Sequence, residues 1–404
     1  MASVIPSGCT DRVPRPILAT KKHNTTLSDL CDDVLLLICD HLDRIRSESE
    51  IPRKNLSLTS HRFNDLLSSD LFKTLRINAP LKLLAECQLY HYHAQTLKVD
   101  MFGSLWWWCS GIYVSGDDVT DLFRLISKLP HLRCLEFRMM SRSIDLFEAV
   151  FDGEVSADLF VLPSVENLIV TNSATFLTRH CPNLKSLVIQ DGGECLVEVY
   201  SSIDIRLCPV LPMYAGGKLP SETLTSLDAI ATWTVNELGY LVKSFPNLRH
   251  VTMRSETYCY RARIDTITEI LGKGLKDLQS LKLSKIGHLD MGFRSLWKRK
   301  IYECKPEEHR KRLWQENEVR RVQAENLVAR LAFGANQSLR ECWIGEKRVA
   351  KRMMSRDSCT EGVHTMKWLW RREQEDIDDC STGAEWAKYR AEREAVVVLV
   401  EEGT

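Results

Sequence analysis

The chain has 404 residues, 44% of them apolar and 27% charged, which is ordinary for a soluble globular protein. Its 54 basic residues balance 54 acidic ones, so the composition gives no overall basic footprint for nucleic acid or for an anionic membrane. No apolar run approaches the roughly 18 residues of a membrane span, and the 14 cysteines form no CxxC pair. We expect a cytoplasmic or nuclear protein with reduced thiols and without nucleic-acid or membrane partners.

Residues 1–26 show neither helical nor strand periodicity. They contain Pro6, Pro14 and Pro16 among scattered basic residues. Such a segment cannot bury enough apolar surface to order itself, so we expect a disordered N-terminal arm.

The stretch from Leu30 to Leu75 contains two helical patterns separated by a charged loop. The first helix has an apolar stripe with further leucines beside it, which is more apolar surface than one small helix of the same chain would cover. A unit of about 45 residues usually needs a neighbour or partner. The stripe contains Val34, Leu37, Ile38, His41 and Leu42, with Leu35 and Leu36 beside it; the later pattern contains Leu56, Phe63, Leu66, Leu67 and Phe72.

This stretch resembles an F-box, the module by which substrate receptors dock on the Skp-type linker of cullin-RING (SCF) ubiquitin ligases. The family pattern runs Leu-Pro-x-Glu/Asp-Val/Leu-Leu-x-x-Ile-x-x-x-Leu and later Leu-Ser-Leu-x-x-x-x-Phe/Trp, and Cys31 stands here at the position of its proline. Asp33 and Ser57 also match. The resemblance implies a helical module at residues 27–76 whose linker-binding residues are Leu30, Val34, Leu35, Ile38, Leu42, Leu56, Leu58 and Phe63.

Between residues 77 and 345, short apolar frames recur in the pattern Leu/Val-x-x-Leu-x-Leu/Val/Ile. The end of each frame alternates as a strand with one buried face requires, and four frames follow segments with helical periodicity. One helix and strand cannot bury their apolar side alone, so such units are expected to stack. The frames are HAQTLKVDM, LPHLRCLEF, LPSVENLIV, CPNLKSLVI, FPNLRHVTM and LKDLQSLKL, and the helical segments lie in DVTDLFRLISKLPHL, SATFLTRHCPNL, TVNELGYLVKSFPNL and IDTITEILGKGLKDL.

These frames resemble a degenerate leucine-rich repeat array, in which Pro-Asn-Leu recurs at residues 182–184 and 246–248. We therefore predict an α/β fold, with a small N-terminal helical F-box-like module followed by an irregular leucine-rich-repeat-like α/β solenoid with a helical C-terminal cap. The alternative is an ordinary mixed α/β domain with coincidental leucine frames.

Two inserts interrupt the frames. Alternation would bury one or two of Trp106, Trp107 and Trp108 and expose the rest. Exposed tryptophan is a frequent interaction hot spot, so these residues are possible substrate contacts; the alternative is that at least two of them pack in the core. Residues 191–226 are rich in Gly and Pro and predict a long loop.

The C-terminal part of the chain differs from the repeated frames. Residues 299–330 predict a long charged helix, residues 338–344 a terminal strand, and residues 346–404 a charged C-terminal tail.

The sequence shows no catalytic, cofactor-binding or metal-binding set. Gly216-Gly217-Lys218 lacks the flanking residues of a phosphate-binding loop, and His91 and His93 have no further ligand at suitable spacing. We therefore expect no enzyme activity and no cofactor.

The F-box resemblance implies a substrate-recruiting adaptor of an SCF-type E3 ubiquitin ligase. Its partners would be the Skp-type linker, the cullin scaffold and a protein substrate held on the repeat region, and Ile38→Asp would abolish linker binding. One alternative is a repeat-based interaction scaffold unconnected with ubiquitin, which would be soluble and monomeric alone. Another is a small-molecule enzyme within an α/β domain, which would need a deep polar pocket.

Overall fold

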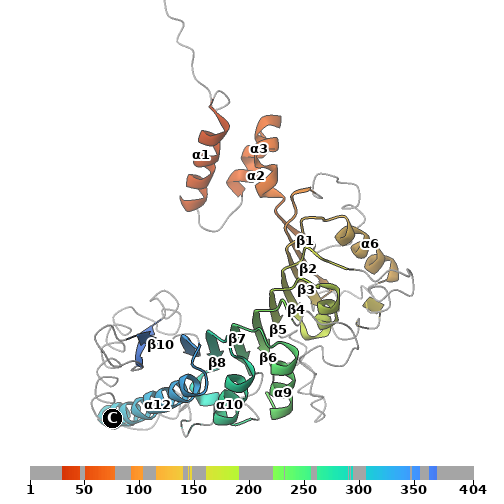
Figure 1. Ribbon diagram of the computed structural model, residues 1–404. Coiled ribbons are helices and arrows are strands. Elements are labelled where there is room, and N and C mark those ends of the chain that lie inside the picture. The colour runs from red at the N-terminus through yellow and green to blue at the C-terminus, as the bar shows by residue number, and fades with distance from the viewer. Residues whose placement is uncertain are drawn as a thin grey trace, which may run out of the picture. The chain divides into compact units, whose positions relative to one another are not determined.

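The computed structural model describes most of the central part of the chain and separates it into two units, Met1–Leu71 and Phe72–Thr404 (Figure 1). The predicted arm at residues 1–26 and the three tryptophans 106–108 lie outside the described residues. The described residues are 30–45, 51–77, 92–102, 115–139, 144, 146–147, 161–190, 222–231, 233–255, 262–289, 291, 293, 306–345, 348–354 and 364–370.

The first unit consists of helices in its described part. Two acidic residues begin α1, where they interact favourably with the helix dipole. Leu35 and Cys39 of α1, four residues apart, are buried, as are Phe63 and Leu67 of α3. Because residues at i and i+4 share one helical face, these pairs form the core of the unit. The helices are α1 (Asp32–Ile45), α2 (Ile51–Ser57) and α3 (His61–Leu71).

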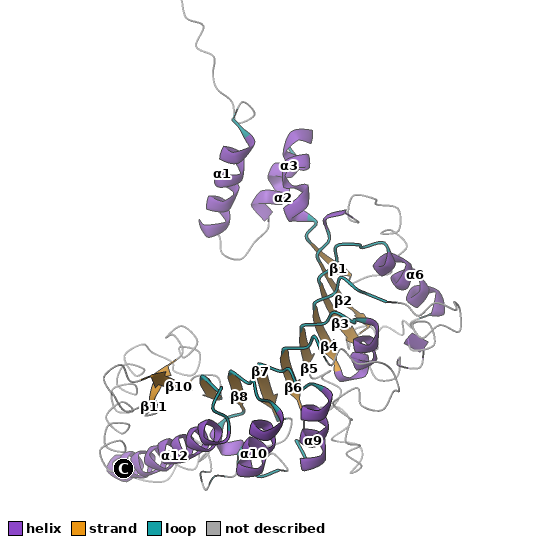
Figure 2. Cartoon of the chain, viewed as in Figure 1, coloured by secondary structure: helices purple, strands orange, loops and turns teal. Residues whose placement is uncertain are grey.

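The second unit is an α/β structure, as predicted. Its strands join one sheet in the order of the sequence (Figure 2). Strands β1 to β9 pair in parallel, whereas β10 is antiparallel to both β9 and β11. The strands are β1 (Thr74–Ile77), β2 (Thr96–Phe102), β3 (Cys134–Met139), β4 (Asn167–Thr171), β5 (Ser186–Gln190), β6 (Ser226–Ile230), β7 (His250–Arg254), β8 (Ser280–Leu283), β9 (Glu341–Ile344), β10 (Arg348–Met354) and β11 (His364–Trp370).

Helices connect the parallel strands and lie on one side of the sheet (Figure 2). Capping boxes begin two of them, Ser115 with Asp118 at α6 and Thr234 with Glu237 at α9. The helices are α6 (Gly116–Ser127), η4 (Asn172–His180), α9 (Val235–Ser244), α10 (Ile264–Gly274), η5 (Ile286–His288) and α12 (Glu307–Ala335).

The segment SATFLTRH forms the 3-10 helix η4, whereas we predicted an ordinary helix there. The hydroxyl of Thr175 donates to the carbonyl of Asn172, and that of Thr178 donates to the carbonyl of Thr175. A 3-10 helix rises about 2.0 Å per residue against about 1.5 Å in an α-helix. It therefore spans the distance between two strands with few residues.

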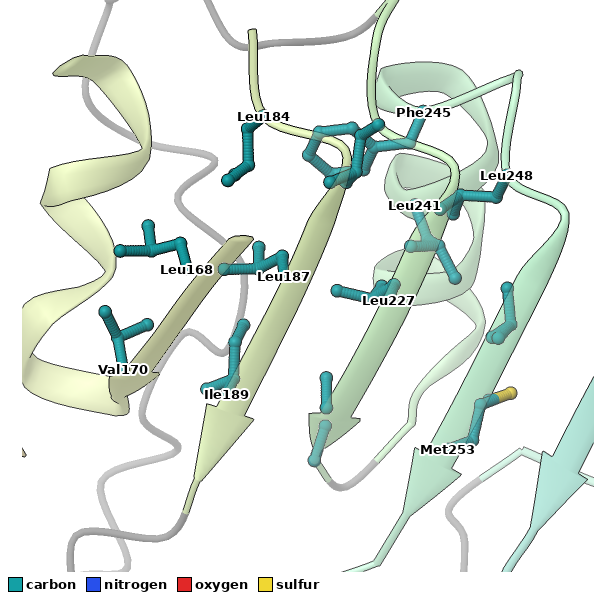
Figure 3. Packing of buried hydrophobic residues seen from close by; sticks show 14 of the residues in the cluster. Leu168, Val170, Leu184, Leu187, Ile189, Leu227, Leu241, Phe245, Leu248 and Met253 are labelled. Atoms are coloured by element: carbon teal, nitrogen blue, oxygen red, sulfur yellow. The ribbon is translucent and has the colours of Figure 1, made fainter. Parts of the chain in front are cut away.

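The core lies between the sheet and the helices (Figure 3). Every second residue is buried in β3 and in β5 to β9, as Leu187 and Ile189 are in β5, and Leu227 of β6 belongs to the same apolar cluster. From α9 and the turn after it, Leu241 and Phe245 join the cluster. The alternation predicted from the frames is therefore confirmed in these strands.

The backbone ahead of the strands repeats one hydrogen-bond arrangement. The carbonyl of Arg133 accepts from the amides of Glu166 (2.9 Å) and Asn167 (3.0 Å), at the start of the next strand. Carbonyls one strand apart repeat this pair of bonds, so neighbouring turns are held in register. The accepting residues are Lys73, Gln95, Arg133, Glu166, Lys185, Thr225, Arg249 and Gln279.

The asparagine of each Pro-Asn-Leu turn donates a side-chain hydrogen bond to a backbone carbonyl of the preceding turn. Asn183 donates its side-chain amide to the carbonyl of Pro163 (2.9 Å), and Asn247 donates to the carbonyl of Glu222 (3.0 Å). Each asparagine therefore ties its turn to the one before it.

Three boundaries differ from the sequence prediction. Strand β1 begins at Thr74 and belongs to the second unit, because it pairs with β2. Residue 226, the end of the predicted loop, begins β6, whose Leu227 and Ala229 are buried. The sheet continues beyond residue 345 into β10 and β11, where we predicted a charged tail. The long helix predicted at 299–330 is α12.

Candidate interaction surfaces

The first unit exposes apolar side chains that its own core does not use. Val34 is 39% exposed, Leu37 67% and Leu58 76%. Val34 and Leu37 lie three residues apart and share a face of α1, whereas Leu35 and Cys39 take the inward face. We call Val34, Leu37 and Leu58 the exposed apolar set.

The residues predicted to bind a linker protein fall into three groups. Val34 and Leu58 are exposed, whereas Leu35 and Phe63 are buried within the unit, where they support its core. Leu30, Ile38 and Leu56 are half-buried, and the side chain of Leu42 lies outside the described residues.

Leu37 was not among those predicted residues, although it is one of the most exposed apolar side chains of this unit. Its spacing of three residues from Val34 could have identified it. The family pattern does not specify a residue at this position, so a comparison with the pattern could not identify Leu37 as a linker-binding residue.

One arginine joins the beginning of α1 to α3. Arg62 donates from Nη2 to the carbonyl of Leu30 (2.8 Å) and to Oδ1 of Asp32 (2.5 Å). Ser60 accepts a hydrogen bond from the amide of Phe63 at the start of α3. These contacts fix the ends of the helices while leaving the exposed apolar set uncovered.

The sheet face opposite the helices carries charged side chains from neighbouring strands. Glu136 of β3 pairs with Lys98 of β2 (2.7 Å) and with Arg138 of its own strand (2.9 Å). Burial acts to raise the pKa of Glu136, but the hydrogen bond and charge of Lys98, together with Arg138, outweigh it and hold the pKa below its ordinary value. This carboxylate is therefore ionised at neutral pH.

A second charged pair lies further along the same face. Arg254 of β7 donates from Nε to Asp228 of β6 (2.7 Å), and its Nη2 lies 3.4 Å from the carbonyl of Ile189. Between the two charged groups, Ile169 and Val188 are paired in register and half-buried. The open face thus presents an apolar strip between two groups of paired charges.

No group of histidine, cysteine and acidic residues able to hold a metal ion occurs among the described residues. Within those same ranges, no helix is long and apolar enough to cross a membrane.

A scan against models of known protein families found no match to this chain. A search of curated proteins likewise found no similar sequence.

Proposed function

We propose that the chain is a substrate-recruiting adaptor subunit of an SCF-type E3 ubiquitin ligase. Its N-terminal helical unit docks on the Skp-type linker and so on the cullin scaffold, and its second unit holds a protein substrate in the cytoplasm or nucleus. The observation that carries the proposal is the exposed apolar set, on a small helical unit whose core is already filled by Leu35, Cys39, Phe63 and Leu67. Large exposed apolar side chains on a small helical unit favour a partner.

The second unit of this proposal is an irregular leucine-rich-repeat-like solenoid. Three observations support it: parallel strands in sequence order, the repeated hydrogen bonds at the turns, and the asparagines that tie successive Pro-Asn-Leu turns together. A stack of this kind offers an extended face for a protein ligand. The open face around Ile169 and Val188 is where we expect the substrate to lie.

The proposed protein performs no bond chemistry of its own. It holds the substrate beside the conjugating enzyme of the ligase, which raises the effective concentration of the attacking lysine and orients it. No cofactor enters this mechanism.

The test is co-purification of the linker with a double variant, Leu37→Asp with Leu58→Asp. Burying one such leucine contributes about 1.5–3 kcal/mol, and a carboxylate in its place would lose that energy and add a desolvation cost. We expect the linker to disappear from the purified complex. Ile38→Asp would be less informative, because Ile38 is half-buried and the substitution would also disturb the packing of α1.

The matched control replaces two exposed apolar residues of the second unit, Val235→Asp with Leu327→Asp. Their side chains are 51% and 48% exposed. This control should retain the linker. Recovery of the linker at wild-type amounts with the Leu37 and Leu58 variant would disprove the docking proposal and favour the alternative, a repeat-based interaction scaffold unconnected with ubiquitin.

A further inference from the structure

A row of basic residues lies at the end of the sheet where the parallel strands begin. Each member immediately precedes a strand, and all are exposed. They stand ahead of β1, β3, β5, β7 and β9, so they occur at every second strand. We call this row the strand-entry edge; it consists of Lys73, Arg133, Lys185, Arg249 and Arg340.

The strand register aligns these residues. Each pair of first strand residues is matched across the sheet, as Cys134 is with Asn167 and His250 with Ser280. The backbone carbonyl of each row member except the last accepts two amide hydrogen bonds from the following strand, so the main chain is held while the side chain remains exposed.

The basic residues are regularly spaced. Neighbouring strands lie about 4.8 Å apart, so positions two strands apart are about 9.6 Å apart, and the row spans about 38 Å. Lys185 pairs with Glu166 (2.9 Å). In the part of the chain that the structure describes, the other four members form no salt bridge.

The residues directly ahead of the intervening strands β2, β4, β6 and β8 are not basic: they are Gln95, Glu166, Thr225 and Gln279. Glu166 stands ahead of β4, and the exposed Glu222 and Asp277 lie in the turns leading to β6 and β8; Lys276, beside Asp277, is basic. Basic positions along the edge therefore alternate with neutral or acidic ones, and three carboxylates lie at or near the intervening positions. A nucleic-acid strand carries a phosphate about every 3.4 Å and would meet these carboxylates as well as the basic side chains. A ligand with one negative charge per two strands would avoid them.

We propose that the strand-entry edge binds an acidic segment of a protein partner in polyproline II conformation, with carboxylates at every third residue. That helix has three residues per turn and rises about 3.1 Å per residue, so such carboxylates lie on one side about 9.3 Å apart. This spacing matches the row. The inference rests on the proposed function only in identifying the partner as a substrate.

The test measures fluorescence anisotropy of a labelled (Glu-Pro-Pro)5 peptide with the purified full chain at low salt. The comparison peptide has the same composition, with its five glutamates contiguous. We expect the spaced peptide to bind at least about tenfold more tightly, because only its charges meet the row in register. Equal binding of the two peptides would overturn the proposal.

The variant is Arg133→Glu, Arg249→Glu and Arg340→Glu together. The control, Arg263→Glu with Lys285→Glu and Arg320→Glu, changes the net charge equally at exposed positions away from this edge. We expect the first triple to lose at least about tenfold in affinity and the control to stay within about twofold. If the Arg133, Arg249 and Arg340 triple variant bound the spaced peptide with wild-type affinity, the inference would be contradicted.

Two further measurements complete the test. If the glutamate triple does not fold, the same three arginines replaced by glutamine should still weaken binding, and unchanged affinity there would overturn the proposal. Displacement of the peptide by single-stranded oligothymidylate at lower concentration would assign the edge to nucleic acid instead. The linker takes no part in these measurements, so their failure is separate from failure of the docking proposal.

Discussion

Arg348 of β10 donates a hydrogen bond from Nη1 to Oε2 of Glu325 on α12, and both side chains are buried. Arg321, one helical turn before Glu325, donates to the other carboxylate oxygen. Glu325 therefore sits between two arginines, one from its own helix and one from the antiparallel strand that follows the parallel array. A second arginine of the same strand, Arg352, donates to the carbonyl of Phe333 (2.5 Å) near the end of α12.

We predict that Glu325→Ala strongly destabilises the second unit. The substitution removes the carboxylate that Arg321 and Arg348 share inside the protein, and losing one partner of a buried ion pair costs about 3–5 kcal/mol. Urea unfolding measures the change. Glu316→Ala, which removes an exposed partner 3.8 Å from Arg312 on the same helix, should cost less than about 0.5 kcal/mol. Equal effects of the two substitutions would show that the buried pair does not stabilise the fold.

Replacing two helical glycines by alanine should change the stability of the protein in opposite directions. A Cβ at Gly272 of α10 would lie 2.2 Å from the carbonyl oxygen of Ala335 in α12, so the helices would have to separate. We expect Gly272→Ala to cost about 1–3 kcal/mol, as overpacking does. At Gly239 of α9, a Cβ would meet no atom within 4 Å, and Gly239→Ala should stabilise by about 0.5–1 kcal/mol. Thermal unfolding of both variants distinguishes these signs, and a stabilising Gly272→Ala would rule out the close helix contact.

We predict that the free energy of unfolding falls at acidic pH, in part because Glu136 becomes protonated. Its pKa is lowered in the folded protein, so its contribution is fully present above the unfolded pKa of about 4.3 and is lost as the pH falls through the folded pKa. Glu136→Gln should therefore be less stable than the wild type at pH 7, and the difference should shrink on acidification below about pH 4. Lys98→Met should reduce the same pH dependence, because it removes the larger of the two partner effects. A difference between Glu136→Gln and wild type that stays constant with pH would contradict this assignment.

The cysteines should differ in reactivity according to burial. Burial raises the pKa of Cys181 and of Cys342 to about 12, so both remain protonated thiols at neutral pH. Cys31 is exposed at the start of the first unit. Mass spectrometry after brief maleimide treatment should find Cys31 labelled and Cys181 and Cys342 protected until urea is added. Rapid native labelling of Cys342 would mean that α12 and β10 do not cover the end of the sheet.

Local patterns predicted much of the second unit. The frames around Leu187 and Val251 became parallel strands with alternate residues buried. Leu224, Leu227 and Ala229 have the same spacing and could have identified β6, but the preceding Gly- and Pro-rich residues concealed it. The antiparallel β10 could not be predicted, because its place depends on Arg348 and Arg352 reaching a helix that precedes it in the chain.

The candidate surfaces were less predictable. The helical pattern assigned apolar character to Val34, Leu35, Leu37 and Ile38 alike, and only packing within the first unit separated the buried Leu35 from the exposed Leu37. The basic row likewise requires a register between distant strands: Ser280 of β8 pairs with Glu341 of β9, 61 residues later, and this pairing brings Arg340 into one row with Arg249.

By itself, the sequence determined most of the helices and strands of the parallel part of the sheet and which residues of those strands face a core, because these properties depend on neighbours a few positions away. Tertiary structure decided which apolar residues stay exposed, which charges are buried together and which basic residues stand in one row. Those properties depend on contacts between residues distant in the chain, and local periodicity carries no information about such partners.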